Sequence, residues 1–232
     1  MRARPGRSKI SSVPSLLPLA ATVVALFSAP LPAPLPAFEI AHVQKPAVLR
    51  AYPGGPVVAR LGAKTEFGSP QTLAVVRSRG AWLAVVSTER PNGRLAWVRA
   101  NVVRLTHTRL SLTLDLSRRT LVLKSGTSVV RGMRVGVGRA GSSTPIGRFA
   151  VTDKLSGGRY GPFYGCCIMA LSAHQPHLPS GWPGGDRIAI HGTNVPATIG
   201  AAASAGCAHA RDADLRVLMR RVPLGTPVFI HA

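Results

Sequence analysis

Acidic and aromatic residues are both scarce in this chain of 232 residues, which has 8 Asp and Glu against 29 Lys and Arg, and only 5% aromatics. The formal net charge of +21 indicates polyanionic surroundings without naming the polyanion. The basic residues stand singly in strand-like segments, and no basic run is interleaved with aromatics, so we expect no nucleic-acid partner. Anionic wall polymers or a membrane surface would attract the same charge.

Long hydrophobic runs are also few. The apolar stretch Leu16–Phe27 is shorter than the about 20 residues that a membrane-spanning helix needs. It follows the basic segment Arg2–Lys9 and precedes the proline-rich tract Pro30–Pro36, an order typical of an export signal. We therefore expect residues 1–37 to be a signal peptide or signal anchor, and the protein to be exported to the periplasm or the cell wall.

Cysteine is rare, with three residues at positions 166, 167 and 207. A bridge between the neighbours Cys166 and Cys167 would be strained and uncommon. Because the number is odd, at least one thiol stays free, and a free thiol in an exported protein raises the question of its chemistry. The spacing of Cys and His fits no zinc pattern, so we expect no metal.

Glycine and proline are plentiful, at 24 and 20 residues, and they separate short apolar runs, which favours a mainly β chain. After a linker at residues 38–46, five strand-like segments predict a small N-terminal β-barrel within residues 38–106, its core completed by Trp82 and Trp97. Gly80–Val85 and Gly93–Val98 resemble parts of the bacterial Src-homology-3-like module, which implies binding of wall peptides. A spacer barrel without a ligand is the alternative.

Residues 107–232 predict a second, β-rich domain. Leu110–Leu116 alternates strictly between apolar and polar residues, as a half-buried strand does. One helix is predicted around Asp212–Arg221, with acids at its start and two arginines at its end. The chain is therefore expected to be a small β-barrel followed by a β-rich domain with a single C-terminal helix.

The second domain holds a cysteine and a histidine that suit nucleophilic catalysis. Cys207 follows Gly206 and precedes the predicted helix, so we expect the helix dipole to lower the pKa of its thiol. His191 ends a predicted strand, where a rigid scaffold can aim its imidazole as a general base. The backbone N–H of Cys207 is a candidate oxyanion donor.

The residues around this pair resemble those of a known family. His191-Gly192-Thr193 and Ser204-Ala205-Gly206-Cys207 are similar to the signature of the L,D-transpeptidase catalytic domain. The stretches Ser143–Phe149 and Leu224–Val228 resemble two further motifs of that domain, in the same order. The resemblance covers roughly residues 110–232.

The resemblance implies a peptidoglycan L,D-transpeptidase that needs no cofactor. Its thiolate would form a thioester with a tetrapeptide stem, release D-Ala and pass the acyl group to an amine, linking diaminopimelate residues. Carried over onto this sequence, the catalytic residues are Cys207, His191 and Gly192, and the substrate-binding residues are Ser204, Gly206 and His209. Peptidoglycan stem peptides would be its partners, and we expect a monomer.

Two positions depart from the family pattern. Ala205 stands where the family has His or Arg, and His209 stands where it has Arg or Asn. Two alternatives therefore remain: a weak or inactive wall-binding protein of the same fold, and a stem-trimming L,D-carboxypeptidase that uses water as acceptor. We further expect the loop Ser172–Asp186 to cover the site, and removal of residues 38–105 to leave turnover of soluble peptides nearly intact.

Overall fold

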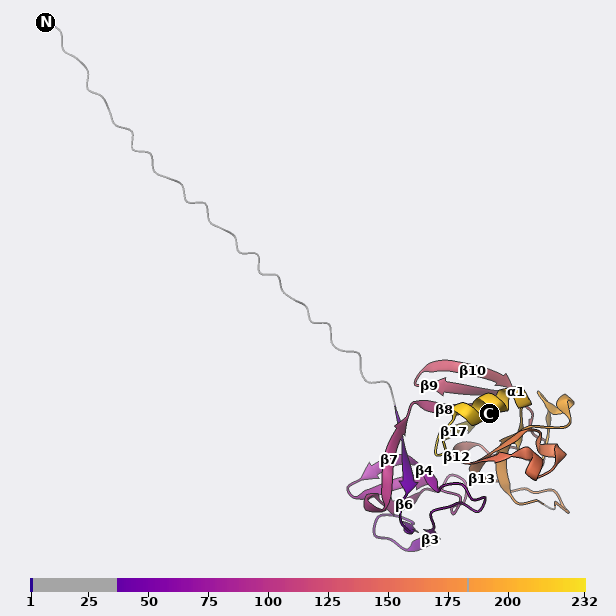
Figure 1. Cartoon of the computed structure of the whole chain (residues 1–232), viewed down its shortest axis with the longest axis horizontal. Coiled ribbons are helices and arrows are strands. Elements are labelled where there is room, and N and C mark those ends of the chain that lie inside the picture. The colour runs from indigo at the N-terminus through magenta and orange to yellow at the C-terminus, as the bar shows by residue number, and fades with distance from the viewer. Residues whose placement is uncertain (2–36, 183) are drawn as a thin grey trace. The chain divides into compact units, whose positions relative to one another are not determined.

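The computed structural model describes Met1, residues 37–182 and residues 184–232 (Figure 1). Apart from its two end residues, the predicted signal segment lies outside the described part. None of the helices described is long and apolar enough to cross a membrane. The described residues from 37 onward belong to one compact unit, in which they form two large β-sheets and one α-helix, and this confirms the mainly β fold class.

Seven strands form the first sheet, in the order β3-β2-β6-β5-β4-β1-β7, with antiparallel neighbours. They are β1 (Phe38–Val43), β2 (Ala47–Arg50), β3 (Val57–Leu61), β4 (Thr72–Arg79), β5 (Trp82–Val86), β6 (Ala96–Arg99) and β7 (Val103–Thr108). A 3-10 turn, η1 (Ala100–Val102), joins the last two.

Strand β1 corrects the expected linker at residues 38–46. It lies between β4 and β7, and this pairing buries Ile40 and Ala41. An apolar segment gains more by pairing and burial than by remaining in water, so it joins the sheet. At the other end β7 continues to Thr108, two residues past the expected boundary at 106.

The first sheet has an aliphatic core. Leu49, Leu73 and Val85 belong to its buried cluster, and neither tryptophan does. Trp97 is buried with the Arg77 guanidinium 5.5 Å from its ring centroid, and half-buried Trp82 has Arg99 at 4.3 Å. Of the two tryptophans expected to complete the core, Trp97 is buried and Trp82 is not, and each has a cation over its ring.

Eight strands form the second sheet, in the order β10-β9-β8-β17-β12-β13-β14-β16. They are β8 (Leu110–Asp115), β9 (Thr120–Ser125), β10 (Ser128–Arg134), β12 (Gly147–Ser156), β13 (Cys167–His174), β14 (Arg187–His191), β16 (Ala208–His209) and β17 (Pro227–His231). Two short strands, β11 (Val137–Gly138) and β15 (Ala202–Ser204), pair in parallel beside it. Its connections contain the 3-10 turns η2 (Gly157–Arg159), η3 (Pro162–Tyr164) and η4 (Pro196–Thr198).

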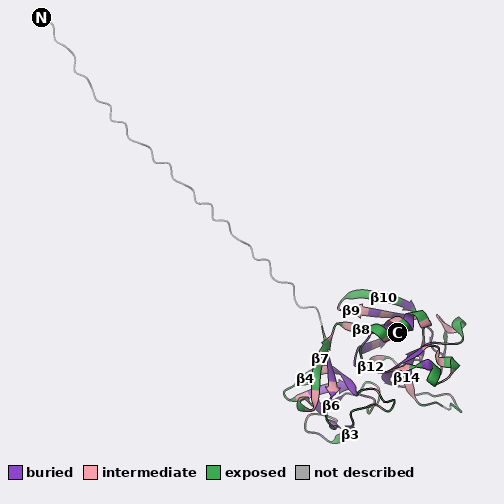
Figure 2. Cartoon of the chain, viewed as in Figure 1, coloured by how far each residue is buried: buried purple, intermediate pink, exposed green. Residues whose placement is uncertain are grey.

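The helix α1 (Asp212–Arg221) packs on this sheet, in contact with β13. Leu215 and Leu218 of α1 join a buried cluster with Phe149 and Met169 from the strands. Burial of each such side chain stabilises the fold by roughly 1.5–3 kcal/mol. Burial is uneven across the sheet, since β10 at its edge is mostly exposed (green in Figure 2), whereas β14 is almost wholly buried.

Candidate active site

The parallel pairing of β14 with β16 brings the predicted catalytic residues together. Ile190 lies opposite Ala208, and His191 lies opposite His209. Because side chains alternate along a strand, His191 and His209 face the same side of the sheet, and Cys207, just before β16, shares that side. Two residues 16 positions apart in the sequence thus line the same cavity.

The Cys207 thiol lies against the backbone of β14. The Ala189 N–H donates to Cys207 Sγ at 3.4 Å, and Sγ lies 4.0 Å from the carbonyl oxygen of Arg187. Burial raises the pKa of the Cys207 thiol to about 11, although the Ala189 N–H opposes this shift by favouring the thiolate. The resting group is therefore a neutral thiol that needs a base.

The expectation of a lowered thiol pKa at a helix N-terminus is wrong. The helix begins at Asp212, and Ala208 and His209 form β16 instead. Their pairing with β14 holds the thiol away from the first turn of the helix, and the dipole acts only within about that turn.

The His191 imidazole is buried and held in one orientation. Its Nδ1 lies 2.6 Å from the Gly192 carbonyl oxygen, which can only accept, so Nδ1 carries the proton and Nε2 is free to act as a base. The ring contacts Tyr164 in an edge-to-face arrangement and His209 in a tilted one, with centroids at 4.9 and 4.8 Å. Burial first, and then His209, lower the pKa of His191 to about 4, against the opposite effect of the Gly192 carbonyl. At neutral pH His191 is an uncharged imidazole.

The turn before Cys207 is built by hydrogen bonds. Ser204 Oγ donates to the Cys207 carbonyl at 2.6 Å and accepts from the Gly206 N–H at 3.1 Å. Gly206 has φ +127°, and a Cβ there would lie 2.1 Å from Gln175 Nε2, so only glycine fits. The hydroxyl of Ser204 thus shapes the turn itself, and the substrate-binding roles of Ser204 and Gly206 stay predictions.

Two residues that the sequence did not single out hold the same turn. Thr144 Oγ1 donates to the Gly206 carbonyl at 2.7 Å, and Gln175 Nε2 donates to the Ala205 carbonyl at 3.0 Å. Thr144 belongs to the motif Ser143–Phe149, so a signal for it existed. Gln175 gave none, because its contact is purely tertiary.

His209, predicted to bind substrate, is half-buried beside His191. Its Nδ1 lies 2.9 Å from Thr198 Oγ1, and burial lowers the pKa of its imidazole. Since His209 Nδ1 is engaged by Thr198, only Nε2 is left for a bound molecule.

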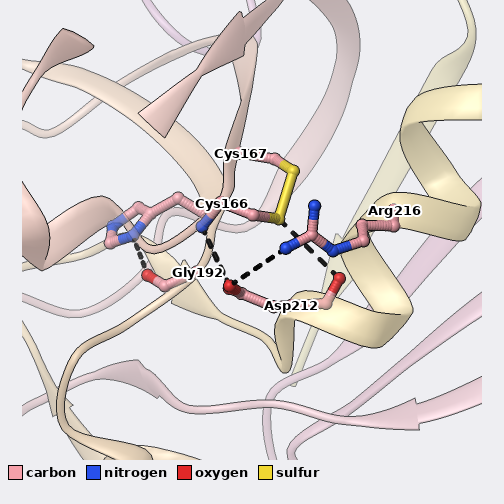
Figure 3. The surroundings of a disulfide bond; sticks show 6 residues. Cys166, Cys167, Gly192, Asp212 and Arg216 are labelled. Atoms are coloured by element: carbon pink, nitrogen blue, oxygen red, sulfur yellow. Dashed lines mark hydrogen bonds and ion pairs between the residues drawn. A yellow bond between two sulfur atoms is a disulfide. The ribbon is translucent and has the colours of Figure 1, made fainter. Parts of the chain in front are cut away.

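Gly192 sits where a side chain has no room. A Cβ there would lie 2.4 Å from Asp212 Oδ1, and the Gly192 N–H donates to the Cys167 carbonyl at 3.1 Å. Cys166 and Cys167 form a disulfide, the pairing judged uncommon from the sequence, and Cys207 is the free cysteine. Figure 3 shows this bridge beside Asp212, whose carboxylate accepts from the Cys166 N–H at 3.1 Å and faces Arg216 at 3.9 Å.

A cavity of about 690 Å³ opens over the pair, and both Cys207 and His191 line it. The loop between β13 and β14 contributes Leu178 and Trp182 to its wall, as expected of a covering loop, although Pro183 lies outside the described residues. Further wall residues are Arg139, Tyr160, Phe163, Tyr164 and Asn194. Within residues 37–182 and 184–232, no group of three or more His, Cys, Asp or Glu side chains could hold a metal ion.

A free thiol just before β16 and a neutral imidazole at the end of β14 line one cavity, and these are the groups that an acyl-transferring cysteine enzyme uses. The family model of the YkuD-type L,D-transpeptidase catalytic domain matches residues 110–230. The chain therefore belongs to the L,D-transpeptidase catalytic domain family.

Curated relatives agree with this assignment. The chain is 30% identical over 122 residues to the candidate L,D-transpeptidase YkuD of Bacillus subtilis, covering 52% of this chain and 65% of that protein. It is 32% identical over 117 residues to the candidate L,D-transpeptidase YbiS of Escherichia coli, covering 44% of this chain and 38% of that one. The chain thus spans less than two thirds of the length of either relative.

Solved structures are also similar. An L,D-transpeptidase from Mycobacterium smegmatis matches 86% of this chain and 100% of its own, at 15% identity and a TM-score of 0.45. Bd1075 of Bdellovibrio bacteriovorus matches 53% of this chain and 48% of its own, at 22% identity and a TM-score of 0.42.

Proposed function

We propose that this protein is a peptidoglycan L,D-transpeptidase that uses Cys207 as nucleophile and His191 as base. The observation that carries the proposal is that a free thiol and an imidazole whose Nδ1 proton is held by Gly192 line one cavity, on segments joined by the pairing of β14 with β16. In the first step Nε2 of His191 takes the thiol proton while Sγ attacks the carbonyl carbon on the L-centre of diaminopimelate in a tetrapeptide stem.

The tetrahedral intermediate then collapses. The C–N bond to the terminal D-Ala breaks, its amine takes the proton from His191, and a thioester on Cys207 remains. The Ala189 N–H favours negative charge on the sulfur during attack, and we assign the Cys207 N–H to the developing oxyanion.

An amine on a neighbouring stem then resolves the thioester. His191 removes a proton from this amine as it attacks, and the sulfur leaves and recovers a proton, which restores the resting pair. In this scheme His209 Nε2 can contact the substrate beside the base, since the His209 ring lies 4.8 Å from the His191 ring and both residues line the cavity. Export through the N-terminal segment would bring the enzyme to its substrate.

The test is mass spectrometry of the full chain after incubation with a tetrapeptide stem, with and without a second stem as acceptor. We expect a thioester adduct on Cys207, release of D-Ala and a cross-linked product. Release of D-Ala with only a trimmed tripeptide would indicate an L,D-carboxypeptidase. An absence of adduct with both the stem and a carbapenem, which the family generally accepts as a pseudo-substrate, would contradict the proposal and favour a wall-binding protein.

A further inference from the structure

A loop of the first sheet contacts the second sheet at the end of β13. Asn92, in the loop between β5 and β6, donates from Nδ2 to the His174 carbonyl at 2.7 Å and accepts at Oδ1 from the His174 N–H at 2.9 Å. The amide of Asn92 thus satisfies both backbone groups of His174, as a neighbouring strand would. This two-point contact fixes the position of the backbone at the last residue of β13.

The His174 side chain extends the same contact in two directions. Its Nε2 lies 2.7 Å from the carbonyl oxygen of Thr88, in the loop between β5 and β6, and its Nδ1 lies 2.8 Å from Oδ2 of Asp186, the residue just before β14. Both ring nitrogens therefore face oxygen acceptors. His174 connects the first sheet with both ends of the loop that walls the cavity.

Gln175, the next residue, links His174 to the turn that holds the nucleophile. Gln175 follows His174 directly, and its backbone N–H donates to the Asp186 carbonyl at 2.7 Å. Its buried side chain donates to the Ala205 carbonyl at 3.0 Å, two residues before Cys207. A displacement of the backbone at His174 would therefore move the donor that holds the turn of the nucleophile.

A second, separate contact reaches the other side of the nucleophile. Glu66 pairs with Arg187 Nη1, and Phe67 lies under the same guanidinium, 5.8 Å from its ring centroid. Arg187 opens β14, and its carbonyl oxygen lies 4.0 Å from Cys207 Sγ. Loops of the first sheet thus contact both segments between which the thiol lies.

We propose that Asn92 is a positioning residue for the acylation of Cys207, and that the first sheet completes the active site rather than only linking the enzyme to the wall. Asn92 touches no reacting atom and acts through His174 and Gln175. This inference rests on the proposed function. It replaces the expectation that residues 38–105 can be removed with little effect on the turnover of soluble peptides.

The test compares acylation of the full chain by a carbapenem in Asn92→Ala, Asn92→Asp and a matched control. Asn92→Ala removes both hydrogen bonds to His174, and Asn92→Asp retains only the acceptor. The control is Thr65→Val, which removes a different hydrogen bond between the two sheets, from Thr65 Oγ1 to Asp153. Each variant is also measured for Tm, so that loss of fold and loss of position are separated.

We expect Asn92→Ala to lower the acylation rate constant by ~10–100-fold, because small displacements of a nucleophile are costly. Asn92→Asp should be intermediate. Thr65→Val should lower Tm without changing the rate constant measured well below that Tm. An Asn92→Ala variant that acylates at the parental rate, or a Thr65→Val variant that slows as much, would overturn the proposal.

Alkylation of Cys207 by a neutral reagent separates this inference from the proposed function, since it needs no substrate. A different alkylation rate in Asn92→Ala from that in the parent and in Thr65→Val supports positioning. Equal rates in all three proteins would overturn it. A parent that fails to acylate with either a stem or a carbapenem would contradict the proposed function alone.

Discussion

Two cysteine turns flank the same strand, β14, and they contact it in opposite ways. On the β13 side the backbone makes the contact, since the Cys167 carbonyl accepts from the Gly192 N–H at 3.1 Å and the sulfurs are joined in the Cys166–Cys167 bridge. On the β16 side the sulfur makes it, since Cys207 Sγ accepts from the Ala189 N–H at 3.4 Å. Both turns thus lie beside β14. They differ in the atom that contacts its backbone, which is a carbonyl oxygen at Cys167 and the free sulfur at Cys207.

The difference extends to the cavity. Cys207 lines it, together with His191, whereas the bridged pair packs against Asp212 and the start of α1 (Figure 3). One turn therefore presents a thiol to a bound molecule, and the other supports the backbone that orients the base. Substitutions at Cys207, at His191, at His209 and at the bridged pair test this difference, in order of decreasing expected effect.

The largest effect is expected at the free thiol. Cys207→Ala removes the atom that forms the covalent intermediate, so we expect no adduct with a stem peptide or a carbapenem and no cross-linked product. Intact-mass spectrometry checks this directly. Cross-linking at the parental rate in Cys207→Ala would show that the nucleophile lies elsewhere.

The next largest effect is expected at the base. His191→Ala should lower acylation by the ~10²–10⁴-fold that general base catalysis typically contributes. Because burial raises the pKa of Cys207 to about 11 and lowers that of His191 to about 4, the resting pair is neutral between these values, and a base is required throughout. The parental rate should fall as pH drops through about 4, when His191 takes up a proton, and His191→Ala should lack this acid limb.

The same pKa shift affects stability. The folded state holds His191 with a pKa of about 4, against an ordinary value of 6.5, so the unfolded chain binds more protons between these two pH values. The contribution of His191 to stability is therefore complete above about 6.5 and is lost as pH falls toward 4. His191→Gln should reduce the loss of Tm between pH 7 and pH 4, and an unchanged pH dependence would contradict the buried, neutral assignment.

The sequence predicts some features of this site, whereas others appear only in the folded chain. The motif around His191 and Cys207 predicted the pair, and the acidic and basic ends of Asp212–Arg221 predicted the helix with its observed bounds. The thiol pKa was predicted in the wrong direction, because burial raises it, and neither that burial nor the pairing of Ala208 and His209 with β14 can be read from the local sequence. Gln175 and Asn92 act across separations of 30 and 82 residues, and only the folded chain reveals them.

A smaller effect is expected at His209, whose ring contacts that of His191 but is not assigned the role of base. His209→Ala removes the contact with Thr198 and the ring beside His191, and should slow acylation by about tenfold or less, since one such hydrogen bond contributes roughly 1 kcal/mol. His209→Asn retains a polar group and should recover much of the rate. If His209→Ala is as inactive as Cys207→Ala while His191→Ala stays active, the two histidines must exchange roles.

The smallest effect is expected at the bridged pair. Cys166→Ala with Cys167→Ala removes the sulfurs but leaves the Cys166 N–H on Asp212 and the Cys167 carbonyl on Gly192, because both are backbone groups. A bridge between adjacent residues closes almost no loop, so its loss should change Tm little. We expect acylation within roughly fivefold of the parent, a change of about 1 kcal/mol or less in the barrier. Asp212→Ala is the matched contrast, since it removes the acceptor of the Cys166 N–H and should slow acylation more than the double cysteine variant does. A double variant as slow as Asp212→Ala would show that the sulfurs, and not the backbone, hold Gly192 and the base in place.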